Sequence, residues 1–162
     1  MIFLTVGAQS SFDRLVRAVD DFFDAHDLND EVFAQIGNSG YKPRNFDAVA
    51  SLDATTFDRR FGQASAIVSH AGMEKITLAC EHGKPLLAMP RLKRLGEIVD
   101  DHEAALADEF EALGHILVAH SARDLTAKLT RLKSFVPLGR AAQAGAVAER
   151  IRSFVQSIDR RR

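Results

Sequence analysis

The stretch 67-IVSHAGMEKITLACEHGKPLLAMPR-91 decides the fold of this chain. It starts with a short apolar run that ends at Ser69 to Gly72, continues as a helix predicted over Glu74 to Glu81, and closes with an apolar run that ends at Met89 to Arg91. A strand, a helix and a strand in this order predict two parallel strands joined by a crossover helix. Polar residues gather where both strands finish, and in a parallel sheet that edge is where ligands bind.

The same alternation runs along the rest of the chain. Strands are predicted over residues 2–6, 32–36, 46–52, 66–68, 85–89 and 116–119. Further helices are predicted over 12–23 with Ser10 or Ser11 as cap, after Thr55 or Thr56, from Asp100-Asp101 to Gly114, and over 125–132. Parallel neighbours need crossovers, and helices supply them, so the pattern predicts an α/β fold with a doubly wound, Rossmann-like parallel sheet.

The chain is predicted to contain one Rossmann-like domain over residues 1–138, followed by a C-terminal amphipathic helix over 139–162. Composition shifts after Pro137-Leu138-Gly139. Beyond that point an apolar stripe recurs at helical spacing, formed by Val147, Ile151, Phe154, Val155 and Ile158. This helix either packs on its own domain or docks on a partner, and the sequence leaves both alternatives open.

Composition narrows the class of protein. The 162 residues carry a net charge of -1, so there is no overall electrostatic reason to bind nucleic acid. The basic clusters Arg91-Lys93-Arg94 and Arg160-Arg161-Arg162 are either local patches or solvated surface. Cys80 is the only cysteine, and its apolar neighbours predict a small buried side chain. No apolar run approaches the roughly 20 residues that cross a bilayer, and the start lacks signal-peptide features, so a cytoplasmic location is expected.

Three turns are expected to meet at the carboxyl edge of the sheet. Each offers small residues and exposed backbone N–H groups, and each precedes a helix start or a turn, which together suit an anion such as a diphosphate. A phosphate-bearing ligand is therefore the leading hypothesis. The candidate binding residues on these turns are Gly7, Ala8, Gln9, Ser10, Ser11, Gly37, Asn38, Ser69, His70, Ala71, Gly72, Met73, Glu74 and Lys75.

The spacing of residues argues against several common nucleotide-binding, catalytic and metal-binding motifs. No Gly-x-Gly-x-x-Gly follows the first strand, and the chain contains no Gly-x-x-x-x-Gly-Lys-Ser/Thr. Ser69 and His70 are not expected to form a nucleophile–base pair, because adjacent residues at a strand end point in opposite directions. The histidines show no metal-ligand spacing, so no metal site is predicted.

Ordered motifs link the chain to a known family. They are Met1 to Gly7 followed by Phe12-Asp13-Arg14-Leu15, Gln35-Ile36-Gly37, Ile67 to Gly72, Gly83-Lys84-Pro85-Leu86, and Met89-Pro90-Arg91 with Asp101-His102. On these motifs, which run to about residue 120, the chain resembles the small, donor-binding subunit of two-component family 28 glycosyltransferases. This group includes PssE-like exopolysaccharide subunits and the soluble subunit of the eukaryotic dolichol-linked UDP-GlcNAc transferase.

The resemblance implies that residues 1–138 form a nucleotide-sugar-binding domain, equivalent to the C-terminal half of a GT-B glycosyltransferase. It implies inverting, metal-independent sugar transfer from a UDP-sugar donor, with no cofactor, in exopolysaccharide or glycan synthesis. The acceptor-binding half would be a separate, membrane-anchored partner subunit that binds a polyprenyl- or dolichol-type lipid-linked acceptor. That partner would recruit this chain to the inner face of the membrane.

The resemblance also implies roles for single residues. Backbone N–H groups of Gly7 to Ser11 and of Gly72 to Lys75 would stabilise the charge on the departing UDP. After Pro90, Arg91 would pair with phosphate, and Asp101 would open the helix on which His102 and Glu103 hydrogen-bond the sugar hydroxyls. No catalytic residue is assigned in this chain, since the general base is expected on the partner.

Two positions depart from the family pattern. The family usually continues Ser-His-Ala-Gly-x-Gly-Ser/Thr, where this chain has Gly72-Met73-Glu74-Lys75. A Glu74 carboxylate 4 Å from a phosphate charge would repel it by about 1 kcal/mol in water and by more in a drier site. Either Glu74 turns away and Lys75 compensates, or the donor site has changed and the chain is a non-catalytic nucleotide-sugar-binding or scaffolding subunit. Glu103, where glutamine is typical, predicts a different sugar.

Overall fold

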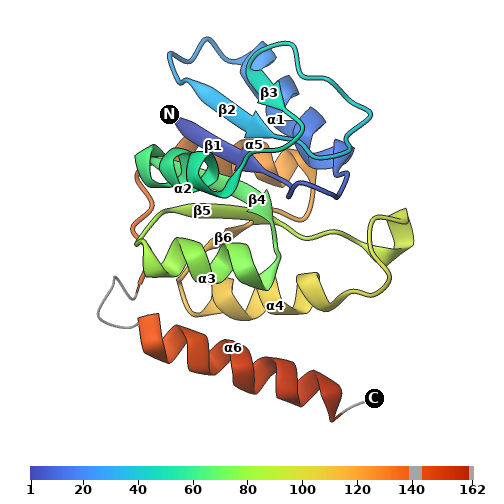
Figure 1. Cartoon of the computed structure of the whole chain (residues 1–162), viewed down its shortest axis with the longest axis vertical. Helices are drawn as coiled ribbons and strands as arrows, with labels where there is room; N and C mark the ends of the chain where they lie inside the picture. Colours follow the sequence, from blue (N-terminus) through green and yellow to red (C-terminus); the bar gives the residue numbers. More distant parts are fainter. Residues whose placement is uncertain (139–143, 161–162) are drawn as a thin grey trace.

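The protein folds around one six-stranded parallel sheet with the strand order β3-β2-β1-β4-β5-β6 (Figure 1). The structure is a computed structural model and describes residues 1–138 and 144–160. All five strand pairs are parallel, which confirms the doubly wound α/β prediction. The strands are β1 Ile2–Thr5, β2 Val32–Gln35, β3 Asp47–Val49, β4 Ala66–His70, β5 Leu86–Met89 and β6 Leu117–Val118.

Helices cover both faces of the sheet (Figure 1). Helices α1 and α5 pack on one face, α2, α3 and α4 pack on the other, and α6 lies outside α3. This arrangement follows from the parallel strands, because each crossover places a helix on a face. The bounds are α1 Asp13–Ala25, α2 Ala54–Gln63, α3 Met73–Glu81, the 3-10 turn η1 Lys93–Leu95, α4 His102–Ala112, α5 Ala122–Leu132 and α6 Ala144–Asp159.

Burial on both faces explains the continuous apolar runs of the central strands. All four residues of β1 are buried; Leu4 points into the core beneath α1 and α5, and Phe3 into the core beneath α2 and α3. Burying such a side chain fully contributes about 1.5–3 kcal/mol. The two cores therefore hold the central strands rigidly, and the loops that leave them start from fixed points.

Two helices begin at residues other than those predicted. The prediction that Ser10 or Ser11 caps α1 is wrong, because Phe12 occupies the N-cap position without a side-chain cap. The backbone C=O of Ser10 instead accepts a hydrogen bond from the N–H of Asn38 at 3.0 Å. Helix α2 begins before Thr55, since Asp53 caps it by accepting from the backbone N–H of Thr56 at 2.9 Å.

The strand order reverses between β1 and β4. From β1 the chain moves outward to β2 and β3, and from β4 it moves outward in the opposite direction to β5 and β6. Thr5 of β1 pairs with Ser69 of β4, and this is the last paired position at the carboxyl ends of the two strands. In doubly wound sheets such a switch point opens a crevice outside the carboxyl ends of the strands.

The C-terminal helix packs on the domain. Ile151 of α6 is 4% exposed and joins the core beneath α3, and Phe154 packs against the same core. Val155 is 37% exposed, and the side chains of Val147 and Ile158 lie outside the described residues. The described part of the stripe therefore faces the chain's own domain, which is one of the two arrangements that the sequence allowed.

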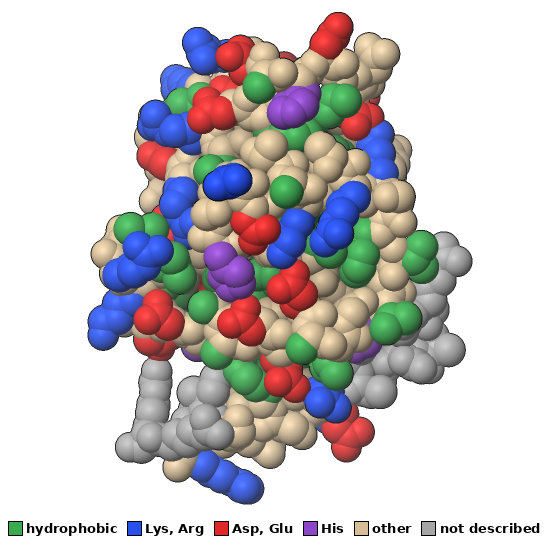
Figure 2. All heavy atoms as spheres, turned by 180° about the vertical axis from the view of Figure 1, so that it is seen from behind, with side chains coloured by type: hydrophobic (Ala, Val, Ile, Leu, Met, Phe, Trp, Pro, Cys, Tyr) green, Lys and Arg blue, Asp and Glu red, His purple; other side chains and the backbone are tan. Residues whose placement is uncertain are grey.

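The face seen in Figure 2 carries acidic and basic side chains interspersed with one another. This mixture is what a net charge of -1 predicts when no local patch dominates a surface.

Candidate functional site

The first two predicted turns interlock at the carboxyl edge of the sheet. The side-chain amide of Asn38 donates to the C=O of Gln9 at 2.9 Å, beside the bond from the Asn38 N–H to the C=O of Ser10. Gly37 has φ +55°, and a Cβ there would lie 2.1 Å from the Ser10 oxygen and 2.7 Å from the Gly7 oxygen. Only glycine allows the two backbones to approach so closely.

The third turn is tied to the first through β4. The hydroxyl of Ser69 donates to the C=O of Thr5 at 2.7 Å, so β1 and β4 are joined at their ends. The ring of His70 packs over Gly72, where an added Cβ would lie 2.5 Å from Nε2. Ala71 is fully buried and so contributes backbone rather than a side chain to the site. The structure thus brings the predicted turns together around the switch point.

His70 is held as a neutral imidazole. Its Nδ1 lies 3.4 Å from the Ser69 oxygen, so the expectation that these two side chains point apart is wrong. The Ser69 hydroxyl donates its proton to the C=O of Thr5, so toward His70 it is an acceptor, which favours the tautomer with the proton on Nδ1 and a free lone pair on Nε2. Burial lowers the pKa of His70 to about 4, against the opposing pull of Glu103. Ser69 is fully buried and is not presented to a ligand.

Helix α3 starts at the carboxyl edge of the sheet, directly after β4. Gly72 is its N-cap, and the C=O of Gly72 accepts from the N–H groups of Lys75 and Ile76. The first N–H groups of a helix have no partner inside the helix, so those of Met73 and Glu74 are available to an anion.

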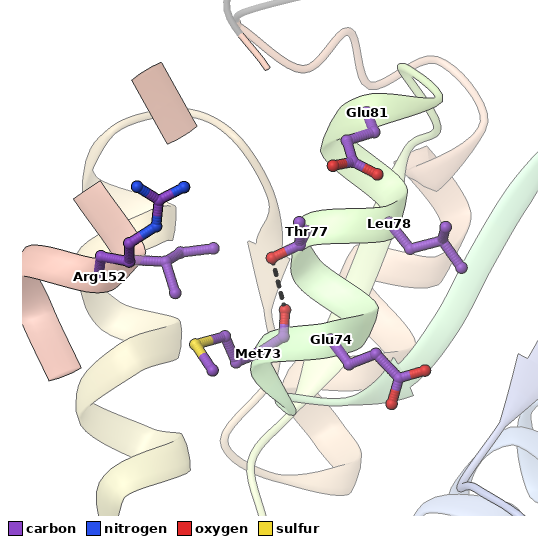
Figure 3. Close-up of a pocket in the computed structure, with 7 residues that line it drawn as sticks. Met73, Glu74, Thr77, Leu78, Glu81 and Arg152 are labelled. Carbon is purple, nitrogen blue, oxygen red and sulfur yellow. Dashed lines mark hydrogen bonds between the residues drawn. The ribbon is translucent and has the colours of Figure 1, made fainter. Parts of the chain in front are cut away.

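Glu74 turns away from this helix start. Its side chain is 82% exposed, and its carboxylate accepts a hydrogen bond from Lys75 Nζ at 2.9 Å. Lys75 is only 10% exposed, and its Nζ lies 4.7 Å from the centre of the Phe57 ring. Figure 3 shows Glu74 on the side of α3 away from Met73. Lys75 thus lies beside Glu74 and pairs with it, and the choice between the two arrangements that the sequence allowed for the donor site stays a prediction.

A groove of about 410 Å³ runs along α3 from this point (Figure 3). Met73, Thr77 and Leu78 line it from α3, and Ile151 and Arg152 line it from α6. The hydroxyl of Thr77 donates back to the C=O of Met73 at 2.9 Å. No sequence pattern predicted this groove, because its two walls come from segments that are far apart in the chain.

Arg91 and Glu103 bind each other. The Nη2 of Arg91 lies 2.5 Å from Oε1 of Glu103, and the backbone N–H of Arg91 donates to Oε2 at 2.9 Å. Their side chains are 16% and 2% exposed. A buried carboxylate needs a cation, and Arg91 supplies it. In this structure Arg91 and Glu103 are thus engaged with each other, and the expected contacts of Arg91 with phosphate and of Glu103 with a sugar hydroxyl stay predictions.

The remaining predicted residues lie between β5 and α4. His102 is the first residue of α4; its side chain is 47% exposed, and its Nδ1 contacts the carboxylate of Asp100. Asp101 accepts from the backbone N–H of Lys93 at 2.9 Å. Pro90 is buried, and its C=O accepts from Arg14 Nη2 at 2.9 Å. Of these residues, Asp101 and His102 are exposed and Pro90 is buried.

The sequence analysis did not predict one ion pair near the site, between Arg14 and Glu97. Arg14 of α1 binds Glu97 through Nε at 2.8 Å and through Nη2 at 2.9 Å. The two residues are 83 positions apart, and Arg14 fits the polar side of an amphipathic helix, so its pattern gives no hint of this partner.

Three further observations concern the reactivity of Cys80, metal binding and membrane-spanning helices. Burial raises the pKa of the Cys80 thiol to about 11, which keeps it protonated and unreactive. Within residues 1–138 and 144–160 no group of three or more His, Cys, Asp or Glu side chains is arranged to hold a metal ion. In the same residues no helix combines the length and apolar character needed to span a membrane.

The parallel sheet and the reversal of its strand order between β1 and β4 define a Rossmann-like α/β domain. Residues 1–158 match the model of the glycosyltransferase family 28 C-terminal domain, so the chain belongs to this family. A search of curated proteins found no match.

Solved structures show the same fold. The glycotransferase of kitacinnamycin has a TM-score of 0.62 at 19% identity, with 94% of this chain and 39% of that chain covered. MurG of Acinetobacter baumannii has a TM-score of 0.62 at 17% identity, with 91% and 44% covered. The solution structure of ALG13 has a TM-score of 0.59 at 17% identity, with 86% and 89% covered. The chain thus has the fold of the C-terminal domain of GT-B glycosyltransferases and spans about two fifths of the first two proteins.

Proposed function

We propose that this chain is the donor-binding part of an inverting glycosyltransferase that uses a UDP-sugar. Membership of family 28 and the fold of a GT-B C-terminal domain support a nucleotide-sugar donor. The switch point between β1 and β4 carries the proposal, because two interlocked glycine turns and the start of α3 lie at this edge of the sheet. Such a set of fixed N–H dipoles suits a diphosphate.

The proposed chemistry is a displacement at the anomeric carbon of the sugar. An acceptor hydroxyl oxygen forms a bond to this carbon while the bond to the UDP oxygen breaks, and the hydroxyl proton passes to a base on the partner. Negative charge grows on the departing UDP. The N–H groups of Met73 and Glu74 at the start of α3 are preorganised donors for that charge, and they need no metal ion. Chelators are accordingly expected to leave transfer unchanged.

The neutral His70 fits this arrangement as a hydrogen-bond acceptor. With its proton on Nδ1, its Nε2 lone pair can receive a hydroxyl of the donor. Since the ring already packs on Gly72, it needs no rearrangement to do so. His102, whose ring is open at the start of α4, is the second side chain proposed to bind a sugar hydroxyl.

We further propose that acceptor binding lies on a separate membrane-anchored subunit, as in PssE-like exopolysaccharide transferases and the dolichol-linked UDP-GlcNAc transferase. That subunit would hold a polyprenyl- or dolichol-type lipid-linked acceptor and would bring this chain to the inner face of the membrane. The ordered motifs of residues 1 to about 120 support this narrower assignment. Deletion of residues 139–162 should abolish co-purification with such a partner, and an intact complex would place the contact elsewhere.

A second function is favoured by the paired charges of the site. Lys75 is neutralised by Glu74 and Arg91 by Glu103, so these two cations near the crevice are engaged with carboxylates. This arrangement suits a non-catalytic subunit that binds a nucleotide-sugar or serves as a scaffold.

Calorimetry with UDP and a panel of UDP-sugars tests the proposal. We expect heat of binding for wild type and about tenfold weaker binding for Gly72→Ala, whose new methyl group must displace His70. Gly62→Ala is the matched control, because a Cβ there meets nothing within 4 Å. Absence of heat with every UDP-sugar, with and without the partner, would overturn the donor-binding proposal in favour of the scaffold.

A further inference from the structure

Carboxylates bind the backbone at the start of the connection between β5 and α4, residues 90–101. The backbone N–H groups of three successive residues, 91 to 93, each donate to a carboxylate at 2.9 Å. The acceptors are Glu103 for Arg91, Glu97 for Leu92 and Asp101 for Lys93. The start of this connection is therefore fastened by carboxylates, while its 3-10 turn is closed by backbone bonds to the C=O groups of Leu92 and Lys93.

Two of these carboxylates are largely buried, and each is neutralised by an arginine. Glu103 is compensated from within the connection, by Arg91. Glu97 has a side chain only 14% exposed and is compensated from outside the connection, by Arg14 of α1. The pair is bidentate, with distances of 2.8 and 2.9 Å, which fixes the orientation of both groups.

Arg14 makes a further contact that anchors the start of the connection. Its Nη2 also donates to the C=O of Pro90 at 2.9 Å, directly after β5. Arg14 belongs to the first turn of α1, which follows the Gly7 to Ser11 turn, and β4 lies between β1 and β5 in the sheet. One guanidinium thus ties the first turn of α1 to the connection that follows β5.

We propose that Arg14 is a positioning residue for the donor site, which it serves by holding the segment 90–101 in place across the switch point. The proposal rests on the proposed function, because the segment and the start of α4 carry Arg91, Asp101 and His102. Without Arg14, the buried Glu97 carboxylate loses its cation and moves toward solvent. The N–H of Leu92 then loses its acceptor, and the segment loosens while the sheet and its two cores remain.

Amide hydrogen exchange in the full-length chain tests whether Arg14 holds the segment 90–101 in place. We expect at least tenfold faster exchange at the Leu92 amide in Arg14→Met, with exchange in β1 and β4 unchanged. Arg17→Met is the matched control, because Arg17 lies one turn further along α1 and stacks on Tyr41 at 4.5 Å. Unchanged exchange at Leu92 in Arg14→Met would overturn the proposal.

Donor binding tests the consequence for function. Arg14→Met should weaken UDP-sugar binding about tenfold, and Arg14→Lys, which keeps the charge but loses the fork geometry, should recover part of the loss. Glu97→Gln should have the same effect as Arg14→Met, and the double variant should lose no more than either single variant. Faster exchange with unchanged affinity would refute the positioning role. If wild type binds no UDP-sugar, the proposed function fails. The exchange data alone then show whether Arg14 holds the segment 90–101 in place.

Discussion

Replacing Glu103 with leucine should destabilise the protein by about 3 kcal/mol. Removing one partner of a buried ion pair typically costs about 3–5 kcal/mol, because the remaining charge stays buried without compensation. The Arg91 side chain is 16% exposed and can gain some water, which places the expected loss at the lower end of that range. The backbone N–H of Arg91 also loses its acceptor, and this contributes to the same loss.

Urea unfolding followed by circular dichroism measures this change as a lower midpoint with an unchanged slope. In thermal unfolding the same loss corresponds to about 6–12 °C, since 1 kcal/mol shifts the Tm of a domain of this size by about 2–4 °C. Glu109→Leu on the same helix is the control. Glu109 also faces an arginine, Arg150 at 3.2 Å, but both side chains are exposed, so its loss should stay below about 1 kcal/mol.

The double variant Arg91→Met with Glu103→Leu should recover most of the stability, because an apolar pair leaves no uncompensated charge. The reasoning would be refuted if Glu103→Leu were as stable as Glu109→Leu. It would also be refuted if the double variant were less stable than Glu103→Leu alone.

Three further predictions concern the turns around the crevice. Gly37→Ala should cost clearly more stability than Gly7→Ala in urea unfolding, since both have positive φ but only the Gly37 Cβ meets backbone, 2.1 Å from the Ser10 oxygen; equal losses would contradict this. His70 has a pKa near 4 in the folded state and about 6.5 when unfolded, so the unfolded state binds the proton first and stability should fall as pH drops from 6.5 to 4. The slope should reach about 1.4 kcal/mol per pH unit and shrink in His70→Gln, and an unchanged slope would count against the buried neutral imidazole. Glu74→Gly should bind UDP at least as tightly as wild type in calorimetry, and weaker binding would make Glu74 a favourable contact.

Much of the fold could be predicted because the central strands are buried on both faces. Continuous apolar runs such as Ile2 to Val6 and Ala66 to Val68 identify strands of a parallel sheet, and the turns after them locate the ligand edge. Helix starts were predicted less well. The backbone N–H of Asn38 donates a hydrogen bond to the C=O of Ser10. Capping rules consider only neighbouring residues in the sequence, so they cannot predict such a contact between two turns.

The site was predicted at the level of backbone but not of side-chain partners. Glycines at strand ends signal close approach, and Gly37 and Gly72 fulfil that role. The Arg91 pairing with Glu103 and the Arg14 pairing with Glu97 join segments whose proximity depends on the finished fold. A charged residue in a sequence has many possible partners, and only tertiary structure selects one.

The pairing of Arg14, Lys75 and Arg91 with carboxylates has a consequence for ionic strength. A site that attracts anions through net positive charge loses affinity as salt rises, because mobile ions screen charges over about 10 Å at 0.1 M. Here the charges cancel within short pairs, and the proposed contacts to a diphosphate come from peptide dipoles at close range. Donor affinity should therefore change little between low and physiological salt. Selectivity among anions would then depend on the shape of the interlocked turns rather than on attraction by net positive charge.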